Sequence, residues 1–136
     1  MKTNITNQPY AADVQQLARR NSDFRQVLNT TERSQLVLMC VPAGGEIGQE
    51  IHAGTDQILV FAEGNGKAIF ADEQRTVAAG DVVVVPAGTQ HNFVADSSGA
   101  LKLFTIYTPP HHRPGTVHAT KADADADTSD QYVASS

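Results

Sequence analysis

From Phe24 onward, the apolar residues of the chain come in short runs rich in Val, Ile, Leu and Phe. Turn-forming residues separate these runs, as in the glycine- and proline-containing stretches 42–45, 64–66 and 86–88. This punctuation predicts strands joined by tight turns. Because no helical pattern interrupts the series, it indicates an all-β sandwich or barrel. The predicted strands cover residues 35–41, 47–52, 57–63, 67–71, 74–78, 82–85, 91–95 and 102–107.

A helical pattern precedes the strands, in residues 13–21. Val14, Leu17 and Ala18 recur at helical spacing, and Asp13 is a favoured N-cap residue. Two arginines stand near the end of the stretch, where cations suit the helix dipole. The stretch is short, so we expect one helix that packs on the outside of the β-structure.

A proline-rich stretch, residues 108–118, follows the last predicted strand. Proline cannot donate to a sheet ladder, so the stretch predicts an irregular surface arm. Residues 119–136 are small and acidic, and they predict a solvated tail with a short helix beginning at Thr120 and disorder over the last residues. The arm could fold over the mouth of a barrel, but we expect its three histidines to be solvated: His111, His112 and His118.

The length of 136 residues fits a single domain. We divide it into an N-terminal segment with the short helix (1–23), a barrel (24–108), and the arm with its acidic, partly disordered tail (109–136). The chain has one cysteine, which excludes an internal disulfide framework.

The charge pattern narrows the possible partners. A net charge of -5 with few, scattered Lys and Arg argues against nucleic-acid binding, which needs a clustered basic face. No apolar stretch approaches the ~20 residues of a membrane span. The N-terminus lacks the apolar middle region of a secretory signal. We therefore expect a cytoplasmic protein with no nucleic-acid or membrane partner.

Two segments carry polar residues of the kind that bind metals. In the first, Glu50 and His52 are two residues apart, so on a strand their side chains point to the same face. Gln57 opens the next predicted strand, from which its side chain can be directed back to that face. In the second, a Pro-x-Gly turn at 86–88 leads into a strand that begins with His91.

These segments resemble the two cupin motifs. The family's second motif, Gly-x5-Pro-x-Gly-x2-His-x3-Asn, fits Gly80, Pro86, Gly88 and His91 at every spacing. The one departure is Ala95 in place of the final Asn. The resemblance implies the cupin fold, a double-stranded β-helix or jelly-roll barrel, with its functional site inside.

The first cupin motif, which carries His-x-His followed by Glu and a closing Gly, fits less completely. His52 and Gly64 conform, whereas Glu50 occupies the first histidine position and Gln57 the glutamate position. The C-terminal stretch also resembles a subgroup of cupins often labelled mannose-6-phosphate isomerase-like.

The resemblance implies a divalent transition metal. A conforming cupin offers it three imidazoles and one carboxylate, whereas this chain offers the imidazoles of His52 and His91, the carboxylate of Glu50 and the amide oxygen of Gln57. Fe, Mn, Ni and Zn are all compatible with such donors. Gln57 either ligates the metal or orients a group behind it. The alternative is a metal-free polar pocket, in which Glu50 hydrogen-bonds both imidazoles.

The leading functional hypothesis is a metal-dependent enzyme acting on a small organic molecule, isomerase-like or dioxygenase-like, with no catalytic residue assigned. The alternatives are a non-catalytic small-molecule-binding or sensing cupin and a structural cupin whose site has decayed.

The apolar run 35–41 is our candidate for an exposed edge strand, through which we expect a homodimer. Three aromatic residues are expected to line the pocket: Phe61, Phe93 and Tyr107.

Overall fold

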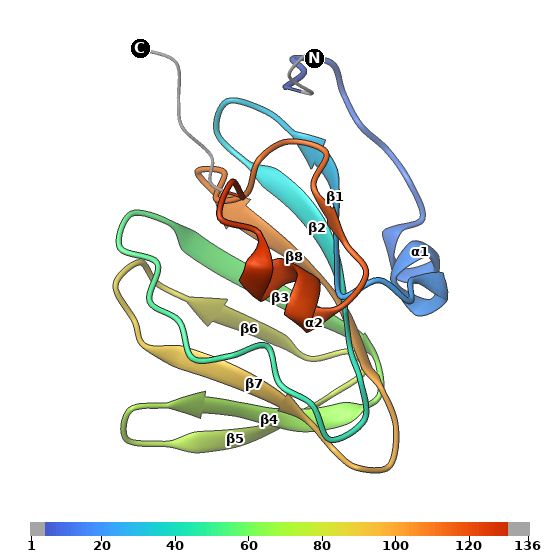
Figure 1. The fold of residues 1–136 in the computed structure, drawn as a ribbon, viewed down its shortest axis with the longest axis vertical. Coiled ribbons are helices and arrows are strands. Elements are labelled where there is room, and N and C mark those ends of the chain that lie inside the picture. The colour runs from blue at the N-terminus through green and yellow to red at the C-terminus, as the bar shows by residue number, and fades with distance from the viewer. Residues whose placement is uncertain (1–4, 131–136) are drawn as a thin grey trace.

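The computed structural model describes residues 5–130, and it confirms the mostly β fold expected from the sequence (Figure 1). The helices are α1 (Val14–Arg20) and α2 (Lys121–Ala126). The strands are β1 (Arg25–Thr30), β2 (Gln35–Val41), β3 (Asp56–Glu63), β4 (Asn65–Phe70), β5 (Gln74–Ala78), β6 (Val82–Val85), β7 (His91–Ala95), β8 (Leu101–Thr108) and β9 (Val117–His118).

The strands form two sheets with antiparallel pairing. The larger has the order β6-β3-β8-β2-β1-β9 and the smaller the order β5-β4-β7 (Figure 1). From β3 to β8 the chain passes back and forth between the two sheets. Strand β8 then lies between β3 and β2 in the larger sheet and pairs with both. This winding is the double-stranded β-helix that the motif resemblance implies.

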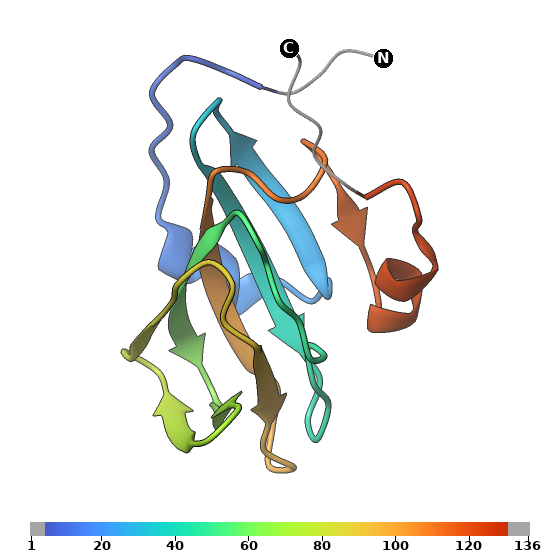
Figure 2. The same cartoon turned by 90° about the vertical axis from the view of Figure 1, so that its left-hand side faces the viewer.

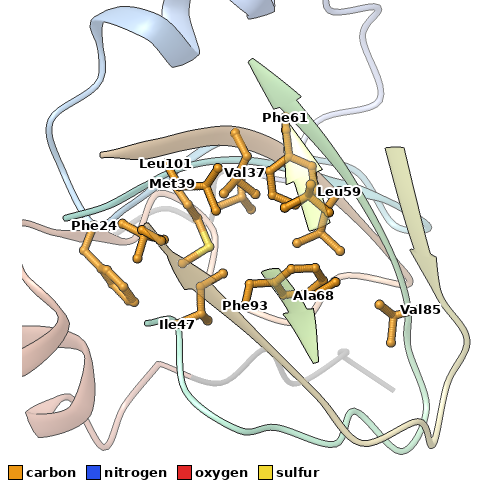
Figure 3. Packing of buried hydrophobic residues seen from close by; sticks show 14 of the residues in the cluster. Phe24, Val37, Met39, Ile47, Leu59, Phe61, Ala68, Val85, Phe93 and Leu101 are labelled. Atoms are coloured by element: carbon orange, nitrogen blue, oxygen red, sulfur yellow. The ribbon is translucent and has the colours of Figure 1, made fainter. Parts of the chain in front are cut away.

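Apolar side chains from both sheets fill the space between them (Figure 3). Val37, Met39 and Leu59 come from the larger sheet, and Ala68 and Phe93 from the smaller. Along β8 every second residue is buried, which is the period-two pattern of a strand with one face on the core. This core supports the strands that carry the polar site.

Helix α1 packs on the outer face of the larger sheet, against β2, β3 and β8. The side chain of Asp13 accepts a hydrogen bond from the backbone N–H of Gln16 at 3.2 Å, which caps the helix as predicted. Ala18 packs against Leu38 and Ala62. The predicted helix is therefore confirmed. No helix within residues 5–130 is long and apolar enough to cross a membrane.

The prediction of a strand over residues 47–52 is wrong. The segment makes one isolated bridge to β7, which joins Glu50 to His91. Gly48 has a φ of 114°, a conformation that glycine adopts readily and that interrupts extended backbone. The segment still lies beside β7, and this position is what the site requires.

The edge position predicted for residues 35–41 is also wrong. Strand β2 pairs with β8 on one side and with β1 on the other. Strand β1 was not predicted, because its sequence lacks a clear apolar alternation, and it extends the sheet beyond β2. Within the described part of the chain the larger sheet ends at β6 and β9. A homodimer stays a prediction, without this surface to support it.

The C-terminal arm has more regular structure than the sequence predicts. It leads from β8 to the short strand β9, which pairs with β1, and then to α2 (Figure 2). The hydroxyl of Thr120 accepts a hydrogen bond from the backbone N–H of Asp123 at 3.1 Å, so the predicted helix start is confirmed. The disorder predicted for the end of the tail concerns residues 131–136, which lie outside the described residues.

Candidate metal centre

The structure brings three of the predicted donors together. Glu50 and His52 lie in the segment between β2 and β3, and His91 is the first residue of β7. The backbone N–H of Glu50 donates to the carbonyl of His91 at 2.9 Å, and the N–H of His91 donates to the carbonyl of Glu50 at 3.0 Å. This reciprocal pair aligns the two segments. One ligand atom from each of the three side chains lies within 4.8 Å of the other two.

Both imidazoles are buried with one nitrogen unpaired. His52 is 6% exposed and His91 2%, and Nε2 of each makes no hydrogen bond within residues 5–130. Nδ1 of His91 lies 2.8 Å from the carbonyl oxygen of Thr89. Because a carbonyl only accepts, Nδ1 carries the proton and Nε2 holds the lone pair. A histidine that ligates a metal has this tautomer and this kind of backbone anchor.

The charge states also suit metal ligation. Burial lowers the pKa of His91, which leaves its ring neutral at neutral pH. Burial alone would raise the pKa of Glu50, but the imidazole of His52, together with the charges of Arg25 and His91, outweighs this effect, and the pKa of Glu50 is lowered. Glu50 is therefore a carboxylate, with one oxygen 3.5 Å from Nε2 of His52. The metal-free alternative, in which Glu50 hydrogen-bonds both imidazoles, is not formed within the described residues.

The amide of Gln57 has a defined orientation at the start of β3. Its Nε2 donates to the hydroxyl of Thr105 at 3.1 Å and to that of Tyr107 at 3.2 Å. The Thr105 hydroxyl itself donates to the carbonyl of Ile58 at 3.0 Å, so it must accept from the amide nitrogen. The amide oxygen is buried and makes no hydrogen bond within the described residues. Like Nε2 of His52 and of His91, this oxygen is therefore a buried polar atom without a hydrogen-bond partner among the described residues.

The three aromatic residues predicted to line the pocket lie close to the site or in the core below it. The ring of Tyr107 meets His52 edge-on, with centroids 5.8 Å apart. Phe93 lies 6.0 Å from His91 and 5.8 Å from Phe61, both centroid to centroid. All three side chains belong to the hydrophobic core, so contact of Phe61, Phe93 or Tyr107 with a bound ligand stays a prediction.

A third imidazole, which the sequence pattern did not predict, lies beside this site. The ring of His111 lies 4.2 Å from that of His52 and stacks on Tyr107 at 5.4 Å, centroid to centroid. Burial and the neighbouring imidazoles lower the pKa of His111 to about 4, so this ring is neutral at neutral pH. The prediction of solvated arm histidines is wrong, because His111 is half-buried while His112 and His118 are 4% and 5% exposed.

The acidic tail holds the arm through Asp130. Its carboxylate lies 2.8 Å from Nδ1 of His112 and accepts a hydrogen bond from the backbone N–H of Arg113 at 3.1 Å. Nε2 of His112 lies 3.3 Å from the hydroxyl of Tyr107. Burial alone would raise the pKa of Asp130, but its interaction with His112, the backbone N–H of Arg113 and the charge of Arg25 together outweigh burial, and the pKa is lowered. The prediction of a solvated tail is wrong for this side chain, which is 7% exposed.

A second pair ties β9 to the tail. Nε2 of His118 lies 2.9 Å from a carboxylate oxygen of Asp127, and Nδ1 lies 3.2 Å from the guanidinium of Arg25. Because a guanidinium only donates, Nδ1 accepts and Nε2 carries the proton. The sequence did contain a signal for these pairs, since the histidines of the arm are followed by aspartates in the tail that could bind them. Their spacing alone does not say which of them meet.

Comparisons with known proteins agree with this fold and site. Over residues 37–107, more than half of the chain, the sequence matches the family model described as the cupin domain. Uncharacterized protein YrkC of Bacillus subtilis (strain 168) is 39% identical over 122 residues, which cover 85% of this chain and 66% of that protein. The chain thus spans just under two thirds of that relative's length.

Two further similarities point the same way. Uncharacterized protein L612 of Acanthamoeba polyphaga mimivirus is 35% identical over 115 residues, which cover 82% of this chain and 72% of that protein. The crystal structure of BH2720 from Bacillus halodurans matches with a TM-score of 0.88 at 36% identity, covering 93% of this chain and 100% of that chain. The mannose-6-phosphate isomerase-like subgroup stays a prediction. With a double-stranded β-helix fold, a candidate metal site at the motif positions and a family match over its central strands, the chain belongs to the cupin family.

Proposed function

We propose that the chain binds a divalent transition metal through Glu50, His52 and His91 and uses it to act on a small organic molecule. The observation that carries this proposal is the pair of buried, unpaired Nε2 atoms beside a carboxylate. Buried polar atoms are nearly always paired. Leaving one unpaired costs about 1–3 kcal/mol. A metal ion would give these donors a common partner.

Gln57 would complete the donor set, as a direct ligand or as a group that holds a water or Glu50 in place. Its free, buried amide oxygen supports the first role. The amide of Gln57 is neutral, so Glu50 is the one negatively charged ligand in this donor set. A divalent metal would therefore leave the site with a net positive charge. The remaining positive charge would favour a small anionic ligand, such as a carboxylate, over a cationic one.

Fe, Mn, Ni and Zn are the candidate metals, because two imidazoles and one carboxylate suit each of them. When bound, such a metal supplies a Lewis acid for an oxygen of the substrate. His52 and His91 would present neutral nitrogens to it, and the buried ring of Tyr107 would help to exclude water. Isomerisation and oxygenation are the reaction classes we favour, with iron pointing to oxygenation and zinc or manganese to isomerisation.

A non-catalytic binding or sensing protein is the second candidate. The amide at Gln57 favours it, because a conforming cupin has there a carboxylate that could also take up a proton. With Glu50 engaged as a ligand, no other carboxylate belongs to the donor cluster of the described residues. The two candidates differ in what removal of the metal abolishes. An enzyme loses a chemical change, whereas a binding protein loses only affinity.

The first test is the metal content of protein purified without chelators, measured by plasma mass spectrometry. We expect near-stoichiometric metal in the wild type and little or none in a His52→Ala, His91→Ala double variant. Glu73→Gln is the matched control, because it removes a carboxylate from an exposed surface pair and should leave the metal content unchanged. A wild-type protein that carries no metal, and takes up none of the four candidates on incubation, would refute the proposal.

A further inference from the structure

The imidazole of His111 lies beside the candidate metal centre, on a segment that the cupin motifs do not include. Its ring centroid lies 4.2 Å from that of His52, 5.4 Å from that of Tyr107 and 4.7 Å from that of His112. It does not belong to the cluster of three donors whose atoms lie within 4.8 Å of one another. His111 therefore stands beside the metal centre rather than in it.

A buried amide holds the backbone of His111 in this position. Gln35 on β2 is 1% exposed, and its Oε1 accepts the backbone N–H groups of His111 at 3.2 Å and His112 at 2.9 Å. Its Nε2 donates to the carbonyl of His112 at 2.7 Å and to the hydroxyl of Thr30 at 3.0 Å. Both acceptor positions and both donors of the amide are thus used. A fully satisfied buried polar group of this kind fixes the geometry of its partners.

The tail holds the same stretch from the other side. Asp130 binds Nδ1 of His112 at 2.8 Å, and the hydroxyl of Tyr107 lies 3.3 Å from the other nitrogen of that ring. The residue next to His111 is therefore fixed through both its backbone and its side chain. In contrast, the ring nitrogens of His111 form no hydrogen bond with any group in residues 5–130. The ring of His111 is therefore positioned by its backbone and by its contacts with Tyr107 and His52, while its nitrogens have no hydrogen-bond partner among these residues.

We propose that His111 contacts the ligand of this site, by hydrogen-bonding an oxygen of a small anion, such as a carboxylate, bound at the metal centre. The inference rests on the proposed function, since it requires the metal. An imidazole carries at least one N–H donor in either protonation state, so His111 can donate to an anionic oxygen. Gln35 and Asp130 are then positioning residues, which act through the arm and do not touch the ligand.

The test uses protein loaded with Co²⁺, whose visible absorption reports both metal uptake and the binding of an added anion. Acetate is titrated into the wild type and into two variants, His111→Ala and His111→Gln. We expect His111→Ala to take up Co²⁺ as the wild type does and to bind acetate about tenfold or more weakly, since a hydrogen bond to a charged group is lost. His111→Gln keeps an N–H donor and should recover part of that affinity.

Arg113→Gln is the matched control on the same arm. The side chain of Arg113 is exposed, and its contact with Asp130 is made by the backbone N–H, which the substitution keeps. At physiological salt its charge is screened, so acetate affinity should stay within about twofold of the wild type. Gln35→Ala should weaken acetate binding in the wild-type background and cause no further loss in the His111→Ala background, as expected of a residue that acts through His111.

The outcomes separate this inference from the proposed function. If the wild type takes up no Co²⁺, the proposed metal site fails and the inference fails with it. If the wild type binds Co²⁺ and His111→Ala keeps full acetate affinity, only the inference is overturned. Loss of Co²⁺ binding in a His111→Ala protein with an unchanged melting temperature also overturns it, because His111 would then be a metal ligand.

Discussion

Replacing Asp130 by alanine removes the carboxylate that joins the tail to the arm. That carboxylate bonds Nδ1 of His112 at 2.8 Å, accepts the backbone N–H of Arg113 at 3.1 Å and lies 3.8 Å from the guanidinium of Arg25. The side chains of Asp130, Arg25 and His112 are 7%, 6% and 5% exposed. The substitution therefore leaves a buried cation and a buried imidazole without their common partner.

The size of the effect follows from this burial. Removing one partner of a buried charge pair costs about 3–5 kcal/mol, because the other charge is left uncompensated. Arg25 keeps a second partner, Nδ1 of His118 at 3.2 Å, so we expect the lower end of that range, about 3 kcal/mol. With a urea m-value of about 1–3 kcal/mol/M, the unfolding midpoint should fall by about 1–3 M.

The assay is urea unfolding of the metal-free protein, with Asp125→Ala as the control. Asp125 belongs to the same tail, but its pair with Lys121 is a surface contact between side chains that are 64% and 35% exposed. Such helix pairs contribute about 0.3–0.5 kcal/mol, so the control midpoint should move by less than about 0.5 M. If Asp130→Ala unfolds at the same urea concentration as the control, then Asp130 is solvated and our account of the arm is wrong.

Three further predictions follow from the site and the packing. Gln57→Glu should tighten metal binding about tenfold or more in a chelator competition, since a carboxylate is a stronger donor than an amide, and an unchanged affinity would exclude a ligand at this position. Burial lowers the pKa values of His91 and His112 in the folded state, so the unfolded chain binds protons first as the pH falls below about 6.5. The urea midpoint of the metal-free protein should therefore drop between pH 7 and pH 5, and a flat profile would contradict these directions. Gly66→Ala should cost at least about 2 kcal/mol, because a Cβ there would overlap a backbone carbonyl of β7, whereas Gly54→Ala meets open space and should leave the melting temperature nearly unchanged.

The parts of the fold that could be predicted are those that local preferences decide. The predicted ranges 74–78, 82–85 and 91–95 coincide with β5, β6 and β7. Asp13 caps α1 because its side chain reaches a backbone N–H three residues ahead, which depends on nothing outside the helix. The turn at 86–88 likewise places His91 at the start of a strand through its own proline and glycine.

The candidate site was predictable in its donors but not in its surroundings. His52 and His91 stand at motif spacing, and with Glu50 they form the donor cluster. The segment that carries Glu50 and His52 is not a strand, so the predicted reason for their common direction was wrong. A backbone pairing with β7 aligns them instead. The orientation of the Gln57 amide depends on the hydroxyls of β8 and has no signature in the linear sequence.

Preferences that act within a few residues were enough to predict the β-rich class, the capped helix and most of the strands. The motif spacing was enough to predict the three residues of the candidate metal site. The position of β2 inside its sheet and the burial of the arm histidines depend on contacts between distant parts of the chain. A histidine in a proline-rich stretch has the same local preferences whether it is solvated or buried. The outcome for His111 and His112 depends on Gln35, which lies 76 and 77 residues earlier in the chain. The free energy of such distant contacts is set by how the whole sheet packs, and the linear pattern does not contain it.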